Sequence, residues 1–335
     1  MRKTADSEAD TAVQPDGDVV RKKKRRALGT IECRLGFLLG LAGLAMSRAG
    51  QLWIGFDVFS QLTLHLIIAT AAFLIGMVIP RAKLLVALLL ILGGAVGIGV
   101  WPHVASRTAH VVGTAEAGER AITVASFNTL WVNENADAVR AEIERIDADI
   151  VTLIELGPDK QKMLDQLRGR YPHQADCFGI DYCKLAILSK FPILESRARA
   201  GWQGPPFVLA RLGPEVGGLT VLGVHTIRFP HSRVQFREAT AIADLIEKLP
   251  GRKLVMGDFN ATPFSRILGV IENRANLLRA TYLPTWPAQA GLPQIAIDHI
   301  FLSPGLKLLE APRIGEPAGS DHYPVYARIA VPAGP

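Results

Sequence analysis

The sequence has few cysteines, no collagen-like repeat and no strong excess of charge. Only 3 of the 335 residues are cysteine, which excludes a small scaffold held together by several disulfides. The 31 glycines follow no Gly-X-Y period, which excludes a collagen-like chain. Hydrophobic residues make up 49% of the chain and the net charge is only +6, which excludes a chain that is disordered throughout.

Two common motifs of phosphate and ester chemistry are also absent. The sequence has no GxxxxGK[ST] loop for nucleotide phosphates and no GxSxG turn for a nucleophilic serine. The positive charge is concentrated in the first 120 residues, where Arg21 to Arg26 form an uninterrupted basic run, whereas residues 121–335 are nearly neutral. A nearly neutral domain gives no general electrostatic support for binding a phosphate backbone.

Apolar residues are concentrated in three stretches of the first third. These stretches are Cys33 to Gly50, Leu62 to Pro80 and Leu84 to Trp101. Because a spanning helix needs about 20 apolar residues, we expect a three-span transmembrane anchor over residues 31–102, preceded by a disordered basic tail over 1–30. The first stretch is the weakest span. Its uncharged part is short, and a tilted or interfacial helix that continues through Trp53 to Phe56 is the alternative.

The loops between these stretches predict the orientation, because basic residues stay on the cytoplasmic side of a membrane. The N-terminal run is strongly basic, the first loop carries only Arg48 with Asp57, and the second turn is Arg81-Ala82-Lys83. Three spans therefore predict a multi-pass protein of the cell membrane whose C-terminal domain is extracytoplasmic or periplasmic. If the first stretch does not span, this orientation inverts.

A polar linker over 103–120 leads to a domain over 121–335 in which strands outnumber helices. Strands are predicted at Ala121–Phe127, Asp149–Ile154, Lys184–Ser189, Phe207–Leu212, Leu219–Val224, Lys253–Met256, Ile295–Leu302, Lys307–Ala311 and Val325–Ala330. Helices are predicted at Asp137–Ile146, Asp159–Leu167, His231–Leu249 and Ser265–Glu272. The pattern is typical of sheets packed together with helices outside. Asn273–Gln294 has no clear period and is interpreted as a loop over the site.

Acidic, amide and imidazole residues recur where these apolar strands end. They are Asn128, Glu155, His225, Asp258, Asn260, Asp298, Asp321 and His322. Each alone has an ordinary explanation as a turn or cap residue, but their coincidence in one domain predicts a single site. Oxygen ligands without a cysteine cluster favour Mg²⁺ or Mn²⁺ over Zn²⁺, and histidines stabilise charge on a phosphoryl oxygen. The set predicts metal-assisted hydrolysis of a phosphoester.

The domain resembles the endonuclease/exonuclease/phosphatase family, whose fold is the deoxyribonuclease-type sandwich. The matching words are SFNTL (126–130), DIVTLIEL (149–156), LAILSKFPI (185–193), GVHT (223–226), GDFNATP (257–263), IDHIFLS (297–303) and SDHYPV (320–325). The resemblance implies an α/β fold, a four-layered α/β-sandwich of two packed, mostly antiparallel sheets flanked by helices. Here three transmembrane helices precede it, and they resemble the anchor of membrane-tethered bacterial members.

The resemblance also implies the metal ligands. Glu155 corresponds to the principal ligand of Mg²⁺ or Mn²⁺, with Asn128 and Asp321 close by. Leu130 stands where some relatives have an acidic residue, which disfavours a second metal ion.

The same resemblance implies the catalytic groups. Asp258 corresponds to the residue that orients or deprotonates the attacking water, and Asn260 to one that helps to place it. His225 and His322 correspond to the residues that bind the scissile phosphate, and Asp298 to the residue that orients His322.

Three further features concern partners and stability. Arg228 follows His225 closely and is a candidate ligand of the substrate phosphate, with a solvated surface as the alternative explanation of the arginines in this segment. Cys177 and Cys183 can form a disulfide if the domain is outside the cytoplasm. The expected partners are a phosphoester substrate (nucleic acid, phospholipid or inositol phosphate) and the lipid bilayer, and no protein partner is readable.

The predicted function is therefore a membrane-anchored, nuclease-like phosphodiesterase. The alternatives are a lipid- or inositol-directed phosphatase or phosphodiesterase, and a non-catalytic binding module. The complete residue set argues against the last of these.

Overall fold

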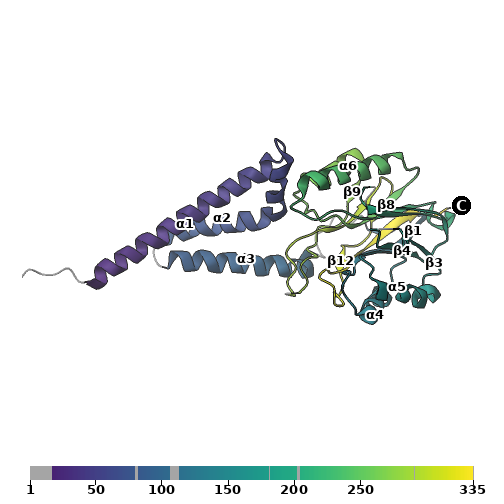
Figure 1. The fold of residues 1–335 in the computed structure, drawn as a ribbon, viewed down its shortest axis with the longest axis horizontal. Helices are drawn as coiled ribbons and strands as arrows, with labels where there is room; N and C mark the ends of the chain where they lie inside the picture. The colour runs from purple at the N-terminus through teal and green to yellow at the C-terminus, as the bar shows by residue number, and fades with distance from the viewer. Residues whose placement is uncertain are drawn as a thin grey trace, which may run out of the picture.

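The computed structural model describes residues 17–79, 82–105, 113–180, 182–201, 204–289 and 291–334. Within these residues, three long helices form an elongated anchor, and the rest of the chain folds into a sandwich at one end of it (Figure 1). Three predicted features lie outside the described residues: the tail over 1–16, the turn residue Arg81 and the linker over 106–112.

The anchor consists of α1 (Gly17–Ala49), the 3₁₀ helix η1 (Ile54–Leu62), α2 (Thr63–Val78) and α3 (Lys83–Ala105). Three segments are long and apolar enough to cross a membrane: Gly29–Ala49, Ile54–Val78 and Lys83–Trp101. The first apolar stretch thus provides a candidate span and ends at Ala49, so it does not continue through Trp53 as one helix.

Two predicted boundaries need correction. The prediction of a disordered tail up to residue 30 is wrong from Gly17 onward, because the basic run is part of α1; lysine and arginine are good helix formers and extend the apolar helix without an apolar period of their own. The linker is also shorter than predicted, because α3 continues to Ala105 and the first strand already begins at Glu119.

Two mixed sheets form the sandwich. The first has the order β11-β13-β1-β2-β4-β3, with β12 also paired to β13, and the second has the order β5-β6-β7-β8-β10-β9. The strands are β1 (Glu119–Asn128), β2 (Ile150–Ile154), β3 (His173–Asp176), β4 (Leu185–Ser189), β5 (Ile193–Arg199), β6 (Phe207–Leu212), β7 (Thr220–His225), β8 (Lys253–Asp258), β9 (Leu278–Arg279), β10 (Asp298–Leu302), β11 (Lys307–Leu308), β12 (Arg313–Ile314) and β13 (Val325–Pro332). Only β1–β2 and β7–β8 are parallel among the described strand pairs, so the sheets are mostly antiparallel, as predicted.

Helices cover the outer face of each sheet, and this arrangement gives four layers (Figure 1). The first sheet packs against α4 (Ala136–Ile146) and α5 (Pro158–Gln166), and the second against α6 (Ser232–Lys248) and α7 (Arg266–Arg274). Two short 3₁₀ helices, η2 (Leu167–Gly169) and η4 (Pro214–Val216), lie in connections. The predicted sandwich is therefore confirmed.

The alternation of side chains along each strand produces the three apolar cores of this sandwich. In β1, Ile122 and Val124 point into the core between the sheets, whereas Ala125 and Phe127 point toward α4 and α5. In β8, Leu254 and Met256 likewise fill the inner core. At the ends of these inner rows stand the polar residues Asn128 in β1 and Asp258 in β8, and both belong to the site.

Candidate functional site

Three neighbouring strands of the second sheet bring an imidazole and two carboxylates side by side. His225 at the end of β7 is paired with Asp258 at the end of β8, and Asp258 is paired with Asp298 at the start of β10. Because β10 runs antiparallel to β8, its first residue lies at the same sheet edge as the last residue of β8. Gly257 is required just before Asp258, because a Cβ there would lie 2.0 Å from the carbonyl oxygen of Val224.

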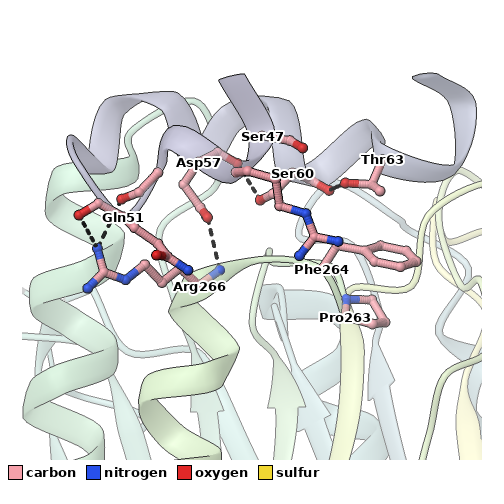
Figure 2. A pocket seen from close by; sticks show the side chains of 10 residues that line it. Ser47, Gln51, Asp57, Ser60, Thr63, Pro263, Phe264 and Arg266 are labelled. Atoms are coloured by element: carbon pink, nitrogen blue, oxygen red, sulfur yellow. Dashed lines mark hydrogen bonds between the residues drawn. The ribbon is translucent and has the colours of Figure 1, made fainter. Parts of the chain in front are cut away.

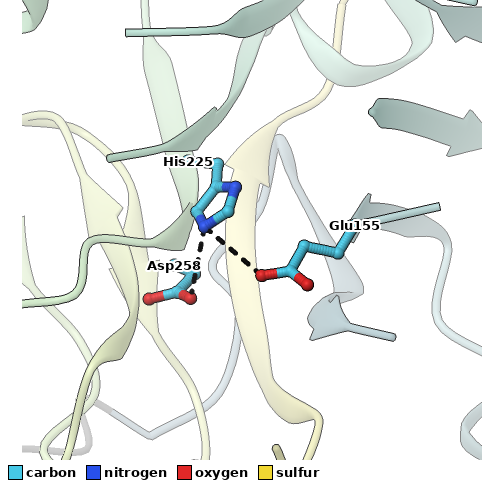
Figure 3. A group of neighbouring side chains, drawn as sticks. All are labelled: Glu155, His225 and Asp258. Carbon is cyan, nitrogen blue, oxygen red and sulfur yellow. Dashed lines mark ion pairs between the residues drawn. The ribbon is translucent and has the colours of Figure 1, made fainter. Parts of the chain in front are cut away.

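The first sheet contributes Asn128 and Glu155 to the same edge. Asn128 continues the inner row of β1, and Glu155 follows β2 with a positive φ of 55°. This left-handed backbone is unfavourable for a non-glycine residue, and it turns the Glu155 side chain toward the second sheet. Figure 3 shows the result: His225 Nε2 lies 3.6 Å from Glu155 Oε1 and 3.7 Å from Asp258 Oδ2.

Asn128 connects the two carboxylates. Its Nδ2 donates hydrogen bonds to Glu155 Oε1 at 3.1 Å and to Asp258 Oδ2 at 3.0 Å. Its Oδ1 accepts a hydrogen bond from the Leu130 N–H at 3.0 Å. Asn128 thus presents its nitrogen to the carboxylates, and a role as a metal ligand would require the amide to turn over.

Glu155 is held in its charged form. Burial opposes ionisation, but the nearby His225, the Asn128 amide and the Trp131 N–H, which donates to Oε2 at 3.0 Å, together lower the pKa of Glu155 below its usual value. The loop that carries Trp131 is fixed by Lys160, which is completely buried. Lys160 Nζ donates to the carbonyl oxygens of Leu130 at 2.8 Å and Asn133 at 2.6 Å.

His322 forms a buried pair with Asp298. Its Nδ1 lies 2.8 Å from Asp298 Oδ2, and this oxygen also accepts a hydrogen bond from Thr285 Oγ1 at 2.6 Å. Burial lowers the pKa of His322, but the carboxylates of Asp298 and Asp258 outweigh it and raise the pKa to about 10. His322 is therefore a cation at neutral pH.

The other nitrogen of His322 faces the centre of the site. Nε2 lies 3.8 Å from Asp258 Oδ2 and 3.9 Å from Asp321 Oδ1. Asp258 is almost completely buried, and burial together with the charge of Asp298 raises the pKa of Asp258 above its usual value. A carboxylate with a raised pKa is a better proton acceptor than an exposed one.

A cavity of about 620 Å³ opens over this cluster, and every group of the cluster except Asn128 and Asp298 lines it. Asn260 and the exposed Arg228 lie in its wall. The Asn260 Nδ2 donates to the Thr226 carbonyl oxygen at 2.9 Å, and the Asn260 N–H donates to Asp258 Oδ1 at 2.8 Å. The structure therefore brings all the sequence-predicted catalytic and metal residues into one place, with Arg228 at its margin.

Three residues of the site were missed from the sequence. Thr285 donates a hydrogen bond to Asp298, and Trp286 Nε1 donates one to Asp321 Oδ2 at 3.1 Å. Lys160 holds the loop beside Glu155 in place. Thr285 and Trp286 belong to the aperiodic segment predicted to lie over the site, and no local signal distinguished them. The neighbouring His299 faces the other side of β10, where its Nε2 lies 2.8 Å from the Ala261 carbonyl oxygen.

The donor set fits a hard divalent cation. Ligand atoms of Glu155, His225 and Asp258 all lie within 4.8 Å of one another. The Oδ1 atoms of Asp298 and Asp321 are buried and have no hydrogen-bond partner in the described part of the chain. Since an unpaired buried carboxylate oxygen is costly, and oxygen donors are those that Mg²⁺ and Mn²⁺ prefer, this edge of the sandwich has the composition of a metal site.

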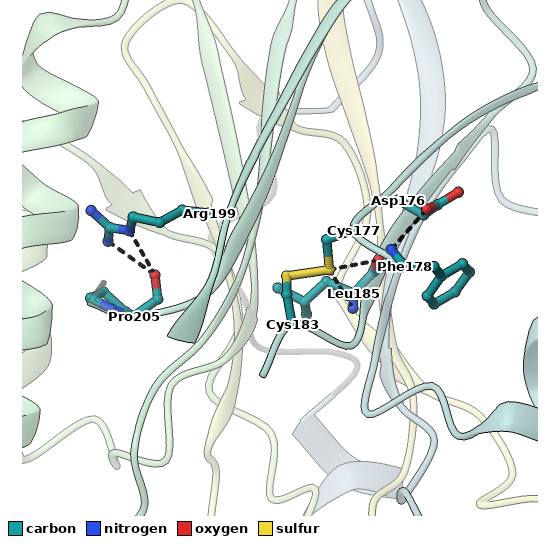
Figure 4. The surroundings of a disulfide bond; sticks show 7 residues. All are labelled: Asp176, Cys177, Phe178, Cys183, Leu185, Arg199 and Pro205. Atoms are coloured by element: carbon teal, nitrogen blue, oxygen red, sulfur yellow. Dashed lines mark hydrogen bonds between the residues drawn. A yellow bond between two sulfur atoms is a disulfide. The ribbon is translucent and has the colours of Figure 1, made fainter. Parts of the chain in front are cut away.

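The two cysteines of the domain are joined away from this site. Cys177 and Cys183 form a disulfide with Cα atoms 5.7 Å apart (Figure 4). The Cys177 sulfur accepts a hydrogen bond from the Leu185 N–H at 3.2 Å, which ties the cross-linked loop to β4. Cys33 in α1 is the remaining cysteine and is unpaired.

Comparison with known proteins identifies the domain. The Endonuclease/Exonuclease/phosphatase family profile matches residues 125–322. No curated protein matches the chain.

Solved structures share the fold at low sequence identity. An endonuclease/exonuclease/phosphatase family protein from Bacteroides thetaiotaomicron is 15% identical with a TM-score of 0.51, over 64% of this chain and 98% of that chain. D. rerio TDP2 complexed with single-strand DNA product is 17% identical with a TM-score of 0.52, over 62% and 98%. A mannosyl-6-phosphatase from Bacteroides thetaiotaomicron is 14% identical with a TM-score of 0.50, over 62% and 99%.

Proposed function

The chain belongs to the Endonuclease/Exonuclease/phosphatase family, and on this premise we propose that it is a membrane-anchored phosphodiesterase that acts outside the cytoplasm. Family membership and the His/Asp cluster make it a metal-dependent phosphoesterase, a hydrolase of phosphoester bonds. The observation that carries the finer proposal is the convergence of Glu155, Asp258 and His322 on one cavity.

In this proposal Glu155 is the principal ligand of one Mg²⁺ or Mn²⁺, with Asp321 and Asn128 beside it. The lowered pKa of Glu155 supports the role, because a ligand carboxylate must be ionised. The bound cation supplies charge stabilisation at a phosphoryl oxygen.

The remaining groups accept the proton of the attacking water and bind the phosphate. Asp258 accepts the proton of the attacking water, and Asn260 fixes the Asp258 carboxylate through its N–H. His322, held as a cation by Asp298, and His225 lie on either side of Asp258 and donate hydrogen bonds to the non-bridging oxygens of the phosphate. Arg228 at the margin of the cavity binds a further oxygen of the substrate.

The proposed location rests on the charge pattern of the anchor. Three candidate spans and the basic N-terminal side favour a cytoplasmic N-terminus and an external domain. The disulfide is consistent with that location, because disulfides persist in oxidising compartments. Alkaline phosphatase fused after the C-terminus should be active in cells and a fluorescent protein at the same position dark; the reverse result contradicts the orientation.

The catalytic proposal is tested with the full chain and bis(4-nitrophenyl) phosphate in Mg²⁺. Asp258→Asn and His322→Gln should each lower kcat at least ~10²-fold, as expected for positioned acid–base groups. His173→Gln in β3, at the far edge of the first sheet, is the matched histidine control and should retain the wild-type rate. Wild-type rates in both site variants, or rates independent of added metal, would contradict the proposal.

Nucleic acids and lipids both contain the phosphodiester that this site would cleave. The nearly equal numbers of acidic and basic residues in 121–335 give little electrostatic support for a nucleic acid. A lipid-directed activity is the second candidate, and the contact between the domain and its anchor favours it.

A further inference from the structure

The anchor is docked against the catalytic domain through specific buried contacts (Figure 2). Asp57 of η1 is buried, and its carboxylate accepts hydrogen bonds from Ser265 Oγ at 2.5 Å and from the Arg266 N–H at 2.9 Å. These groups form the N-terminus of α7, so a residue of the anchor caps a helix of the domain. Arg266 Nη1 returns a hydrogen bond to the carbonyl oxygen of Gly50 at 3.0 Å.

The docked contact also reaches the loop after β8, which carries Asn260. Gln61 Oε1 accepts a hydrogen bond at 2.7 Å from the N–H of Thr262, two residues after Asn260. On the opposite side, Gln294 Nε2 donates to the Ala95 carbonyl oxygen of α3 at 2.9 Å, and Gln294 Oε1 lies 3.3 Å from His65 Nε2 of α2. The anchor therefore holds two loops of the domain in place, one at Thr262 and one at Gln294, and both loops face the membrane helices.

An apolar cavity of about 470 Å³ lies between these contacts. One wall consists of the first turns of α2 and the last turns of α3; the other consists of loops of the domain. Its apolar lining includes Leu64, Ile68, Gly97, Ile98, Phe264 and Tyr282. The volume is within the range of about 300–1,000 Å³ that is typical of small-molecule sites.

The position of the cavity identifies the kind of molecule that can fill it. The α2 and α3 segments that line it belong to two candidate spans, and Trp101, an amphipathic side chain of the sort that gathers at membrane surfaces, lines it at the domain end of α3. Phe264 and Tyr282 are 46% and 54% exposed, so the domain presents aromatic rings beside the same spans. A cavity bounded by spanning helices at this level is in reach of the acyl chains of the bilayer.

The cavity and the catalytic cavity share a wall. Asn260 and Ile297 line the catalytic cavity, whereas Thr262 and Ala296, one or two residues away, line the apolar one. The same holds in the loop over the site, where Trp286 faces the catalytic side and Pro284 the apolar side. An amphiphile with its chain in one cavity thus has its polar end next to the other.

We propose that the apolar cavity binds an acyl chain of a membrane phospholipid and that this lipid is the substrate. The proposal rests on the proposed phosphodiesterase activity. Water adds to phosphorus, one phosphoester P–O bond breaks, and the leaving oxygen takes a proton, so the products are an alcohol and a phosphomonoester. The apolar lining selects for the chain, and Glu155, Asp258 and His322 act on the headgroup phosphate.

The test compares the hydrolysis of ethyl 4-nitrophenyl phosphate and octyl 4-nitrophenyl phosphate, two diesters that differ only in the length of the alkyl group. Both substrates are used as dispersed monomers, and the full-length protein is held in an amphipathic polymer. The quantity measured is the ratio of kcat/KM for the octyl ester to that for the ethyl ester. For the wild type we expect a ratio of at least ten. Gly97→Phe places a ring in the cavity, since a Cβ at Gly97 meets nothing within 4 Å, and should lower the ratio at least tenfold.

Gly93→Phe is the matched control. Gly93 lies one turn earlier in α3, a Cβ there also meets nothing within 4 Å, and the residue does not line the cavity. This variant should keep the wild-type ratio. Phe264→Asp introduces a charge into the cavity from the opposite wall, at an exposed position of the domain, and should lower the ratio as Gly97→Phe does. This second variant keeps the test decisive if Gly97→Phe fails to fold.

A second measurement does not depend on turnover. In nanodiscs with phosphatidylcholine that carries a diazirine in its acyl chain, irradiation should label residues 282–289 in the wild type and in Gly93→Phe, and label them at least tenfold less in Gly97→Phe. Equal labelling and equal ratios in the two glycine variants overturn the inference. If the wild type fails to hydrolyse the ethyl ester, the proposed activity is at fault, and the labelling alone then decides whether the cavity holds a lipid chain.

Discussion

Replacement of Asp298 by asparagine tests how the site holds its buried histidine cation. Asp298 and His322 are both buried, and the Nδ1–Oδ2 distance of 2.8 Å is that of a charge-assisted hydrogen bond. Breaking a buried pair by removing one charge costs about 3–5 kcal/mol. Because asparagine keeps an acceptor for Thr285 Oγ1 and for His322, we expect a smaller loss of about 2 kcal/mol.

The assay is thermal unfolding of the metal-free full chain in EDTA, followed by tryptophan fluorescence. For a domain of this size, 2 kcal/mol corresponds to a lowering of Tm by about 4–8 °C. The pKa of His322 is raised to about 10 in the folded state, so its contribution to stability is complete below its ordinary pKa and is lost as the pH rises through 10. The difference in Tm between wild type and Asp298→Asn should therefore be largest at pH 6 and should narrow above pH 10.

The control is Asp244→Asn, which removes a carboxylate from an exposed ion pair with Arg274. Exposed pairs contribute about 0–1 kcal/mol, so this variant should change Tm little at any pH. In Mg²⁺, Asp298→Asn should also lower kcat at least ~10²-fold. A difference in Tm that is absent at pH 6, or that grows toward pH 10, would refute the assignment of His322 as a cation paired with Asp298.

Three further predictions concern the support of the site. Lys160→Met leaves buried carbonyl groups unpaired and should destabilise the domain by about 2–4 kcal/mol, measured as a lowered Tm, whereas the exposed Lys162→Met in the same helix should not. Thiol titration of the unfolded chain should find one thiol without reductant and three with it, and Cys177→Ser should destabilise the domain by about 2 kcal/mol; three thiols without reductant would contradict the disulfide. Asp57→Asn should weaken the cap on α7 by about 1 kcal/mol and increase amide hydrogen exchange around Ser265, and unchanged exchange there would contradict the docked anchor.

The strands that bear the site were readable from the sequence because they are buried on both faces. Such strands are continuous apolar runs, and the polar residue that ends each run is conspicuous. β8 is an example: the apolar residues of Lys253–Met256 precede Asp258, and the strand ends at that residue. The resemblance to the family added the roles of these residues, which spacing alone does not give.

Two of the missed strands, β3 and β5, are edge strands with the opposite composition, and the other two, β9 and β12, are only two residues long. β3 reads HQAD and β5 reads ILESRAR, and much of β5 is exposed. An edge strand pairs on one side only and tolerates polar residues on both faces, so neither segment shows an apolar run. Their positions are set by pairing with β4 and β6, and this pairing leaves no mark in the local sequence of β3 or β5.

The supporting residues of the site depend on tertiary contacts in the same way. Lys160 lies in a polar helix, where a lysine normally contacts water, and only the folded chain brings it under the loop after β1. Trp286 is in an aperiodic segment and becomes part of the site through its hydrogen bond to Asp321. The contact of Asp57 with α7 joins positions more than 200 residues apart and has no signature in either segment.

The most direct test of the account is the binding of Mn²⁺ to the full chain, measured by electron paramagnetic resonance with the protein in excess. The proposed ligands Glu155, Asp321 and Asn128 predict one bound ion per chain. Glu155→Gln, which preserves the shape of the side chain and removes its charge, should weaken that binding by more than the ~10–100-fold that outer partners of a metal ligand contribute. Binding of the same strength in wild type and Glu155→Gln would contradict the claim that this edge of the sandwich is the metal centre.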